Sequence, residues 1–304
     1  MEAKTKYFHL LEIILICILL QTLMGCKKEV IPISNANEIA RINFFDASEV
    51  FNAIGRDNYI YINDSVPSDN FRNGFPKFRR MDRNDPHGRT FPGSGYMHPN
   101  IRINVHNANS NLYHNVYWFP MQQGEYKFIF STDEKVFAKD TTLKFDPKQY
   151  YAVYLLDDPN NDGAFNVLSF PEDIKVTEGK VRLRVIHLSP DLGGVRIIRN
   201  DVEGKVKKEN FPEVLNYRDV TDYIEIDTTG ASKSHGNILL GLTDAKNPDH
   251  MHKMQIIPAD PGSTYVLLIK GHQNQIQRKL LQKDGTYRSI GIIPNIRTLL
   301  RRLN

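Results

Sequence analysis

The sequence predicts an all-β protein with two tandem immunoglobulin-like antiparallel β-sandwich domains. In residues 181–191 (VRLRVIHLSPD), apolar residues alternate with arginines, and this period of two is typical of a strand with one apolar face. The same pattern occurs in residues 40–50 (ARINFFDASEV). No segment shows a sustained 3.6-residue period, which argues against a mixed helix–strand fold. We therefore expect the two stretches to be the first strands of two related domains.

The bulk composition is that of an ordinary globular protein. The chain has 304 residues, enough for about two domains, of which 40% are hydrophobic and 24% charged. The formal net charge of +4 does not indicate the concentrated basic patches of nucleic-acid-binding proteins, so we expect no nucleic acid partner. The two cysteines are Cys17 and Cys26, which leaves no disulfide framework or cysteine nucleophile in the body of the chain.

Residues 1–25 have the pattern of a lipoprotein signal peptide. A weakly basic start precedes a short apolar run, which closes with Leu23-Met24-Gly25-Cys26. This ending resembles a bacterial lipobox, so cleavage is expected to leave Cys26 as a lipidated amino terminus. A transmembrane anchor, or an ordinary signal peptide with a chance cysteine, is the alternative, although the apolar run is short for a membrane span.

Residues 26–38 are predicted to be the lipidated cysteine and a tether. They contain Pro32, Ser34 and asparagines and show no sustained period. The sequence Cys26-Lys27-Lys28-Glu29 is similar to short tags that send some lipoproteins to the cell surface. We expect a lipid-anchored outer-membrane protein that is surface-exposed rather than facing the periplasm.

The first repeat is assigned to residues 39–173, a linker to 174–180 and the second repeat to 181–304. Alternating apolar or β-branched segments separated by turn residues define the strands. The strands expected in the first repeat are 39–46, 58–63, 100–106, 115–119, 125–131, 136–145, 150–156 and 164–170. Those expected in the second are 181–188, 194–199, 222–227, 236–242, 253–258, 264–270, 276–281 and 287–293.

Tyr151 and Tyr265 occupy matching places, each four residues after an Asp-Pro pair and at the start of an apolar strand. This spacing resembles the tyrosine corner of immunoglobulin-like sandwiches, so we expect both tyrosines to be buried, with hydroxyls bonded to backbone. The tyrosines are 114 residues apart, whereas residues 40 and 181 are 141 apart. The first repeat therefore carries about 27 extra residues, most simply an insertion at 65–100.

The opening of the second repeat resembles a known family. Residues 184–191 (RVIHLSPD) are similar to the V-R-x-x-H-x-S-P-D signature of the domain of unknown function 4397 family. The first repeat departs from the signature, with Asp46 in place of the histidine and Glu49 in place of the proline. The resemblance implies secreted or lipid-anchored bacterial proteins with β-sandwich repeats, and no established activity or catalytic residues.

Motif searching indicates a protein that is not an enzyme. The sequence has no H-E-x-x-H, G-x-S-x-G, Walker or G-x-G-x-x-G motif that would open a catalytic or nucleotide site. His187 and Ser189 share a strand face, but a triad needs a third, orienting group that the sequence does not place. A strand end followed by a turn is the simpler interpretation of these residues.

Asp158, Asn160 and Asp162 form the best metal candidate, a weak calcium site. With Gly163 they match the first half of a calcium-binding loop, but Ser169 stands where that loop has its glutamate. The favoured alternative is a polar hairpin turn, in which Asn, Asp and Gly are preferred for backbone reasons. No other cofactor is predicted.

His250 and His252, in the sequence Asp249-His250-Met251-His252, are a second metal candidate. Imidazoles two residues apart can ligate a transition metal. Without a nearby cysteine or suitably spaced acid, however, a solvated loop is the favoured interpretation.

The insertion at 65–100 interleaves arginines with aromatic residues between prolines and glycines. Long loops in compact domains are usually functional or disordered, and aromatic side chains beside cations suit a glycan, an anionic polymer or an envelope protein. The candidate partner-binding residues are Phe75, Phe78, Arg79, Arg80, Arg83 and Tyr96. The alternative is that the aromatic residues plug the open end of the first sandwich.

Together these features predict a lipid-anchored cell-envelope or surface protein with a non-enzymatic binding or adhesion role. Its expected partners are the membrane, through the lipid anchor, and a glycan or envelope protein. A structural or assembly component of an outer-membrane complex is the alternative, and a hydrolase acting on an envelope or extracellular polymer is a remote one. An assembly component would show an apolar patch or an open sheet edge.

Overall fold

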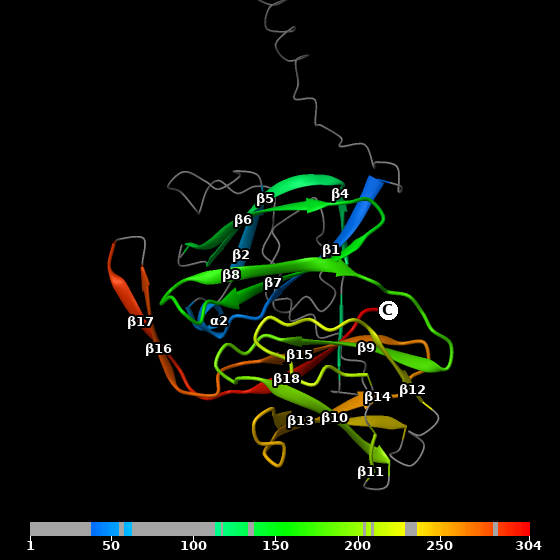
Figure 1. Ribbon diagram of the computed structural model, residues 1–304. Helices are drawn as coiled ribbons and strands as arrows, with labels where there is room; N and C mark the ends of the chain where they lie inside the picture. Colours follow the sequence, from blue (N-terminus) through cyan, green and yellow to red (C-terminus); the bar gives the residue numbers. More distant parts are fainter. Residues whose placement is uncertain are drawn as a thin grey trace, which may run out of the picture. The chain divides into compact units, whose positions relative to one another are not determined.

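Strands rich in apolar residues make up most of the described part of the computed structural model (Figure 1). It describes residues 38–54, 58–62, 113–116, 118–132, 137–202, 205–207, 210–228, 236–281 and 285–304. The first half contains β1 (Ile39–Asp46), α2 (Glu49–Ile54), β2 (Asn58–Ile62), β3 (His114–Asn115), β4 (Phe119–Gln122), β5 (Gly124–Thr132), β6 (Phe137–Phe145), β7 (Tyr150–Asp157) and β8 (Phe165–Glu172). The second contains β9 (Lys180–His187), β10 (Val195–Val202), β11 (Lys205–Lys207), β12 (Ile224–Asp227), β13 (Asn237–Asp244), β14 (Met251–Pro258), β15 (Thr264–Lys270), β16 (Ile276–Leu281), β17 (Tyr287–Ile292) and β18 (Arg297–Arg302).

The all-β prediction is confirmed, and the strands in the described part of the chain form five sheets. The strand orders are β4-β1-β7-β8, β2-β5-β6, β12-β9-β15-β18-β3, β11-β10-β13-β14 and the hairpin β16-β17. The prediction of purely antiparallel sheets is wrong, because β1 runs parallel to β7, β9 to β15, and β18 to β3. Parallel neighbours need a long crossover connection, and alternation within a single strand carries no information about the direction of its neighbour.

Three hydrophobic cores hold the sheets together. The first core combines β1, β7 and β8 with β5 and β6, and Phe44, Phe51 and Phe128 are almost fully buried in it. The second core combines β9, β15 and β18 with β10, β12, β13 and β14. The middle core joins the opposite faces of β1 and β7 to those of β9, β15 and β18, with Tyr154 and Leu268 fully buried. The strands β1, β7, β9 and β15 are therefore covered by apolar contacts on both faces.

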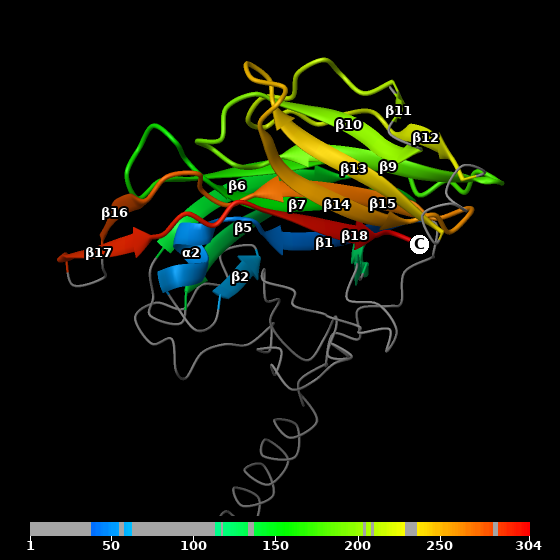
Figure 2. The same ribbon diagram turned by 90° about the horizontal axis from the view of Figure 1, so that it is seen from below.

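The two predicted repeats exchange segments. The hairpin β16–β17, from the second repeat, contributes Leu280, Ile290 and Ile292 to the first core. Figure 2 shows this hairpin beside α2, to the left of the other labelled strands of its own predicted repeat. In return, β3 of the first repeat pairs with β18 in the five-stranded sheet. Residues Glu38–Asn304 accordingly form one compact unit.

The first strands of the two repeats pair in the same register. Ile42 lies opposite Tyr151 in the β1–β7 pair, and Leu183 lies opposite Tyr265 in the β9–β15 pair. Both tyrosines are buried. The Tyr151 hydroxyl accepts a bond of 3.1 Å from the backbone N–H of Asp146, and the Tyr265 hydroxyl lies 3.4 Å from a carboxylate oxygen of Asp260.

Several elements differ from those predicted. The expected strand at 100–106 lies outside the described residues. The pattern missed α2, β11 and β18, and residues 115–119 are divided between the end of β3 and the start of β4. No helix in the described ranges has the length and hydrophobicity of a membrane span.

Candidate functional site

The short helix α2 follows directly on β1 because polar groups cap its first turn. The Ser48 hydroxyl accepts a hydrogen bond of 2.8 Å from the Phe51 N–H, which is the usual N-cap geometry. Asp157, at the end of β7, accepts bonds from the Ser48 hydroxyl and from the N–H of Glu49. A buried carboxylate from another strand therefore fixes where the helix starts, and the helix places Glu49 at the boundary between the two repeats.

Glu49 is the centre of a buried ionic network. Its carboxylate lies 3.0 Å from Nζ of Lys270 at the end of β15 and accepts two bonds of 2.8 Å from Nη2 of Arg297 in β18. The side-chain amide of Asn295 donates a third interaction of 3.1 Å. Asn295 itself is held against Gly271, where a Cβ atom would lie only 2.4 Å from the Asn295 carbonyl oxygen. The sequence separates these partners by more than 200 residues, and only the fold brings them together.

Arg301 forms the second polar group of this region. It is 4% exposed, and its guanidinium donates to the side chains of Asn43 and Tyr154. The same guanidinium stacks over the Phe45 ring, 4.6 Å from the centroid. Both of these hydrogen-bond acceptors are neutral, so no carboxylate among the described residues bonds to this buried cation directly.

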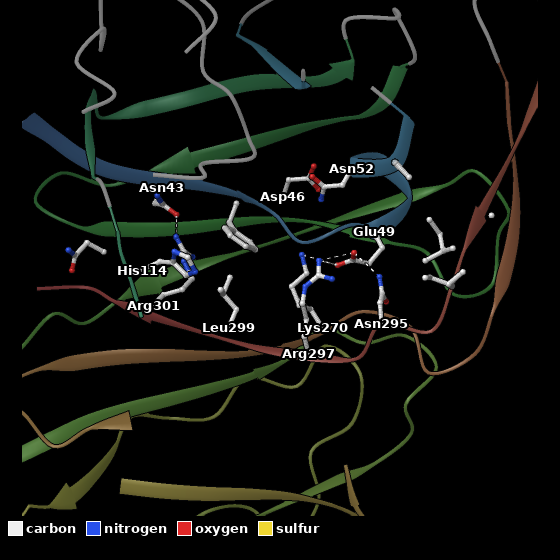
Figure 3. A pocket seen from close by; sticks show the side chains of 16 residues that line it. Asn43, Asp46, Glu49, Asn52, His114, Lys270, Asn295, Arg297, Leu299 and Arg301 are labelled. Atoms are coloured by element: carbon white, nitrogen blue, oxygen red, sulfur yellow. Dashed lines mark hydrogen bonds and ion pairs between the residues drawn. The ribbon is translucent and has the colours of Figure 1, made fainter. Parts of the chain in front are cut away.

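These groups line a pocket of about 560 Å³ between the first strand of one repeat and the last strands of the other (Figure 3). Its size is within the range of about 300–1,000 Å³ that is usual for small-molecule sites. Five ionisable carboxyl, amine and guanidinium groups line it, namely Asp46, Glu49, Lys270, Arg297 and Arg301. A histidine, asparagines and small or apolar residues complete the wall, namely His114, Asn43, Asn52, Asn115, Asn295, Phe45, Ala53, Gly291, Ile292, Ile293 and Leu299.

The pocket combines a surplus of positive charge with hydrogen-bonding amides and apolar surface. Its three cations face two carboxylates, and the single negative charge of Glu49 is shared between Lys270 and Arg297. The Arg297 side chain is 47% exposed, and its bonds to Glu49 use only Nη2. Guanidinium groups bind carboxylates and phosphates through two parallel bonds. Chemically, the arrangement suits an anionic ligand that also carries hydroxyl groups.

The arginines of the stretch 181–191 pack beside the first predicted repeat, with Arg182 buried and Arg184 partly buried. Arg184 bonds Glu172 of β8 at 2.7 Å and stacks over Tyr223, 4.3 Å from the ring centroid. Burial raises the pKa of Glu172 above its ordinary value, although Arg184 and the Tyr223 hydroxyl oppose that shift. Burial also raises the pKa of Tyr223 far above its ordinary value. This cluster holds the first strand of the second repeat against β8.

His187 and Ser189 lie at the end of β9 and are fully buried. The ring nitrogen Nδ1 of His187 accepts a bond from the Ser189 N–H, and Nε2 lies 2.7 Å from the Gly193 carbonyl oxygen. Nδ1 is thus the acceptor, and Nε2 carries the proton. Burial lowers the pKa of His187, which favours this neutral form. The imidazole connects the strand end to the following turn.

The calcium candidates lie in the turn between β7 and β8. The Asp158 carboxylate accepts the Asn160 N–H at 2.9 Å, and the Asp158 N–H donates to the Ala164 carbonyl. Asp162 forms an ion pair of 2.5 Å with Arg278 of β16. The turn is therefore packed on the β16–β17 hairpin, and a cation at Asp162 would compete with the guanidinium.

The other predicted site residues fall outside the described ranges. These are the lipidation candidate and the partner-binding candidates, namely Cys26, Phe75, Phe78, Arg79, Arg80, Arg83 and Tyr96. Sequence reasoning, in turn, missed the pocket residues of α2 and β18. The Ser48 N-cap and the acidic Glu49 in the first turn were the local signals that α2 offered. The run RTLLRR of β18 has no clean alternation, and its partners are remote in sequence.

The fold and the pocket define an all-β protein with mixed sheets and a polar pocket that is lined by residues of α2, β1, β15 and β18. Residues 108–198 match the model of the family described as Domain of unknown function (DUF4397), which confirms the predicted family resemblance over this range. The match covers the end of the first predicted repeat and the opening of the second, including 181–191 but not 40–50. No curated protein matches the chain.

Proposed function

We propose that this protein is a lipid-anchored, non-enzymatic cell-envelope protein that binds an acidic saccharide in the pocket beside Glu49. The observation that carries the proposal is Arg301, a buried cation in the pocket wall whose hydrogen-bond acceptors, in the described part of the chain, are neutral. Buried charges are usually paired, and Arg301 interacts electrostatically with the buried Glu172 without a hydrogen bond to it. A bound carboxylate or sulfate group would supply an anion in direct contact with the guanidinium.

The remaining pocket groups can contact the hydroxyl groups and the ring of a saccharide. Asparagine amides can donate to and accept from hydroxyl groups, and the apolar faces of Phe45 and Leu299 offer contact to a ring. The half-exposed Arg297 is held by Glu49, so the entropic cost of ordering its side chain on binding is reduced. Recognition in the pocket therefore needs little rearrangement of the described residues.

The proposal also includes the cellular location of the protein and the assignment of its sheets to immunoglobulin-like sandwiches. The ending Leu23-Met24-Gly25-Cys26 supports lipidation, and the lysine after the cysteine supports display at the surface of the outer membrane. The matching registers at Tyr151 and Tyr265 support an assignment of the sheets to two tandem immunoglobulin-like sandwiches. A ligand-binding protein in this position would meet extracellular or envelope polysaccharide.

The test is binding of the full chain, purified in detergent, to uronic-acid oligosaccharides and to neutral oligosaccharides of the same length. We expect preference for the acidic series and weaker binding for Arg301→Lys, which keeps the charge but loses the planar pair of donors. Arg297→Gln should also weaken binding. Arg278→Gln, which removes an ion-paired arginine outside the pocket, is the matched control.

Equal binding of acidic and neutral sugars, or equal loss in the Arg278→Gln control, would reject the pocket as the site. The insertion at 65–100 is tested in the same assay by replacing residues 68–97 with a short Gly-Ser linker. If binding is lost with the linker and kept in both pocket variants, the site lies in the insertion.

An assembly component of an outer-membrane complex is the second candidate, and β14 favours it. This strand is at the edge of its sheet among the described strands, and it exposes Met251, Met254 and Ile256. Edge strands with exposed apolar side chains are templates for pairing with another chain. Met254→Lys should abolish recovery of a partner from cross-linked membranes if this candidate is correct.

A further inference from the structure

The hairpin β13–β14 brings together three side chains with the chemistry of transition-metal ligands. Asp244 ends β13, and His250 and His252 lie at and just after the turn. One ligand atom from each residue lies within 4.8 Å of the others. The two imidazole rings are 4.7 Å apart between centroids, at 49° to each other. Asp244 supplies the acidic partner that the sequence pattern around the histidines lacked.

A β-bulge positions His252. Leu242 pairs with Lys253, and the next residue, Thr243, pairs with Met251, so His252 is the extra residue on β14. Bulges re-aim a side chain and are enriched beside functional sites. Here the bulge directs an imidazole toward Asp244 on the neighbouring strand, with Nε2 of His252 at 3.9 Å from Oδ2 of Asp244.

The Nε2 atom of His252 is buried without a hydrogen-bond partner in the described structure. The side chain is 7% exposed, and the distance of 3.9 Å to Asp244 is too long for a hydrogen bond. A buried polar atom without a partner costs free energy. A ligand that accepts the nitrogen lone pair would remove that cost.

The carboxylate of Asp244 is already oriented for such a ligand. Its Oδ1 atom accepts the N–H groups of Lys246 at 2.6 Å and Asn247 at 3.1 Å. These bonds fix the carboxylate and leave Oδ2 on the side of His252. Hydrogen bonds that orient a ligating group in this way are a regular feature of metal centres.

We propose that Asp244, His250 and His252 bind a divalent transition metal ion, with Zn²⁺ as the best match. Two imidazoles and a carboxylate are a usual zinc ligand set, with water in the fourth position. Zn–N distances of about 2.0–2.1 Å place tetrahedral ligand atoms roughly 3.4 Å apart. The exposed His250 ring has room to turn and close this gap, whereas His252 and Asp244 are held by the bulge and the turn.

The test is metal titration of the full chain, purified in detergent without a histidine tag and stripped with a chelator. Zn²⁺ is followed by calorimetry and Co²⁺ by its visible absorption. We expect one ion per chain and displacement of Co²⁺ by Zn²⁺. His252→Gln and Asp244→Asn should each weaken binding more than about 100-fold, because even groups outside the coordination shell cost about 10–100-fold.

The matched controls are Asp249→Asn, which removes an acid of the same turn, and His114→Gln, which removes a histidine elsewhere. Both should bind Zn²⁺ as the wild type does. Circular dichroism without metal checks that each variant is folded, and Zn²⁺ should raise the melting temperature of the wild type but not of His252→Gln. Binding that survives both ligand variants, or that is absent in the wild type, overturns the proposal.

Discussion

Leu280→Ala should destabilise the whole unit, although Leu280 lies in a small two-stranded hairpin. The side chain is 1% exposed in the first core, together with Ile290 and Ile292 of the same hairpin. The substitution removes three carbon atoms, worth roughly 0.8 kcal/mol each in transfer free energy. The Leu280 side chain also packs against the turn at Gly163, where a Cβ atom would lie 2.7 Å from the backbone of β16. The site therefore cannot collapse easily, and the cavity brings the expected loss to about 3 kcal/mol.

The measurement is chemical denaturation followed by fluorescence and by circular dichroism. Trp118 is the single tryptophan, and its indole N–H donates to the Leu303 carbonyl at 3.0 Å, beside the middle core. It therefore reports on a region that does not contain Leu280. If Leu280→Ala shifts the unfolding transition equally in fluorescence and in circular dichroism, the first and middle cores unfold together.

Tyr287→Ala is the matched control for this prediction. Tyr287 lies on the same hairpin and is 68% exposed, so its removal should change the free energy of unfolding by no more than about 0.5 kcal/mol. If Leu280→Ala lowers the free energy of unfolding no more than this control does, the hairpin does not contribute to the first core.

Three further predictions concern other parts of the chain. Tyr151→Phe and Tyr265→Phe should each lower the free energy of unfolding by about 1 kcal/mol, because the hydroxyl and its hydrogen bond are lost. The alanine variants should lower it by about 3 kcal/mol or more, because the packing of a buried ring is lost as well. Denaturant melts in which the alanine variants are as stable as the wild type would contradict this prediction. Because burial raises the pKa of Glu172 above 4.5, the folded state holds that proton more tightly than the unfolded state. The stability of the wild type relative to Glu172→Gln should therefore be highest below pH 4.5 and fall as pH rises through the raised pKa, in melts across that range. Cys26→Ser should release the protein from membranes or stall its processing, and unchanged fractionation with normal maturation would contradict lipidation.

Most of the described strands could be predicted because they carry a local signal of their own, whereas β11 and β18 do not. The boundaries of β1, β15 and β16 were predicted to the residue, since an apolar face repeats every second position and turn residues mark the ends. Strand direction and the pairing of β18 with β15 could not be predicted. Arg301 is buried against Asn43 and Tyr154, which lie 258 and 147 residues away, and its own stretch of sequence carries no sign of these contacts.

The pocket and the proposed metal ligands were hidden for different reasons. Glu49 pairs with Arg297 across 248 residues, and one sequence carries no signal for such a contact. Asp244 was missed because the expected strands ended at 242 and began again at 253, whereas β13 reaches Asp244 and β14 begins at Met251. Because each predicted strand end was wrong by two residues, the sequence analysis did not place Asp244 opposite the two histidines.

The place of the β16–β17 hairpin in the first core has a consequence for the order in which the chain can fold. A ribosome delivers β8, ending at Glu172, well before it delivers Ile276. At about 5–20 residues per second, the delay is on the order of 5–20 s. During that interval the aromatic residues of β5 and α2 lack the apolar cover that the hairpin supplies. The amino-terminal half therefore cannot complete its first core before Leu280, Ile290 and Ile292 of the carboxyl-terminal segment arrive.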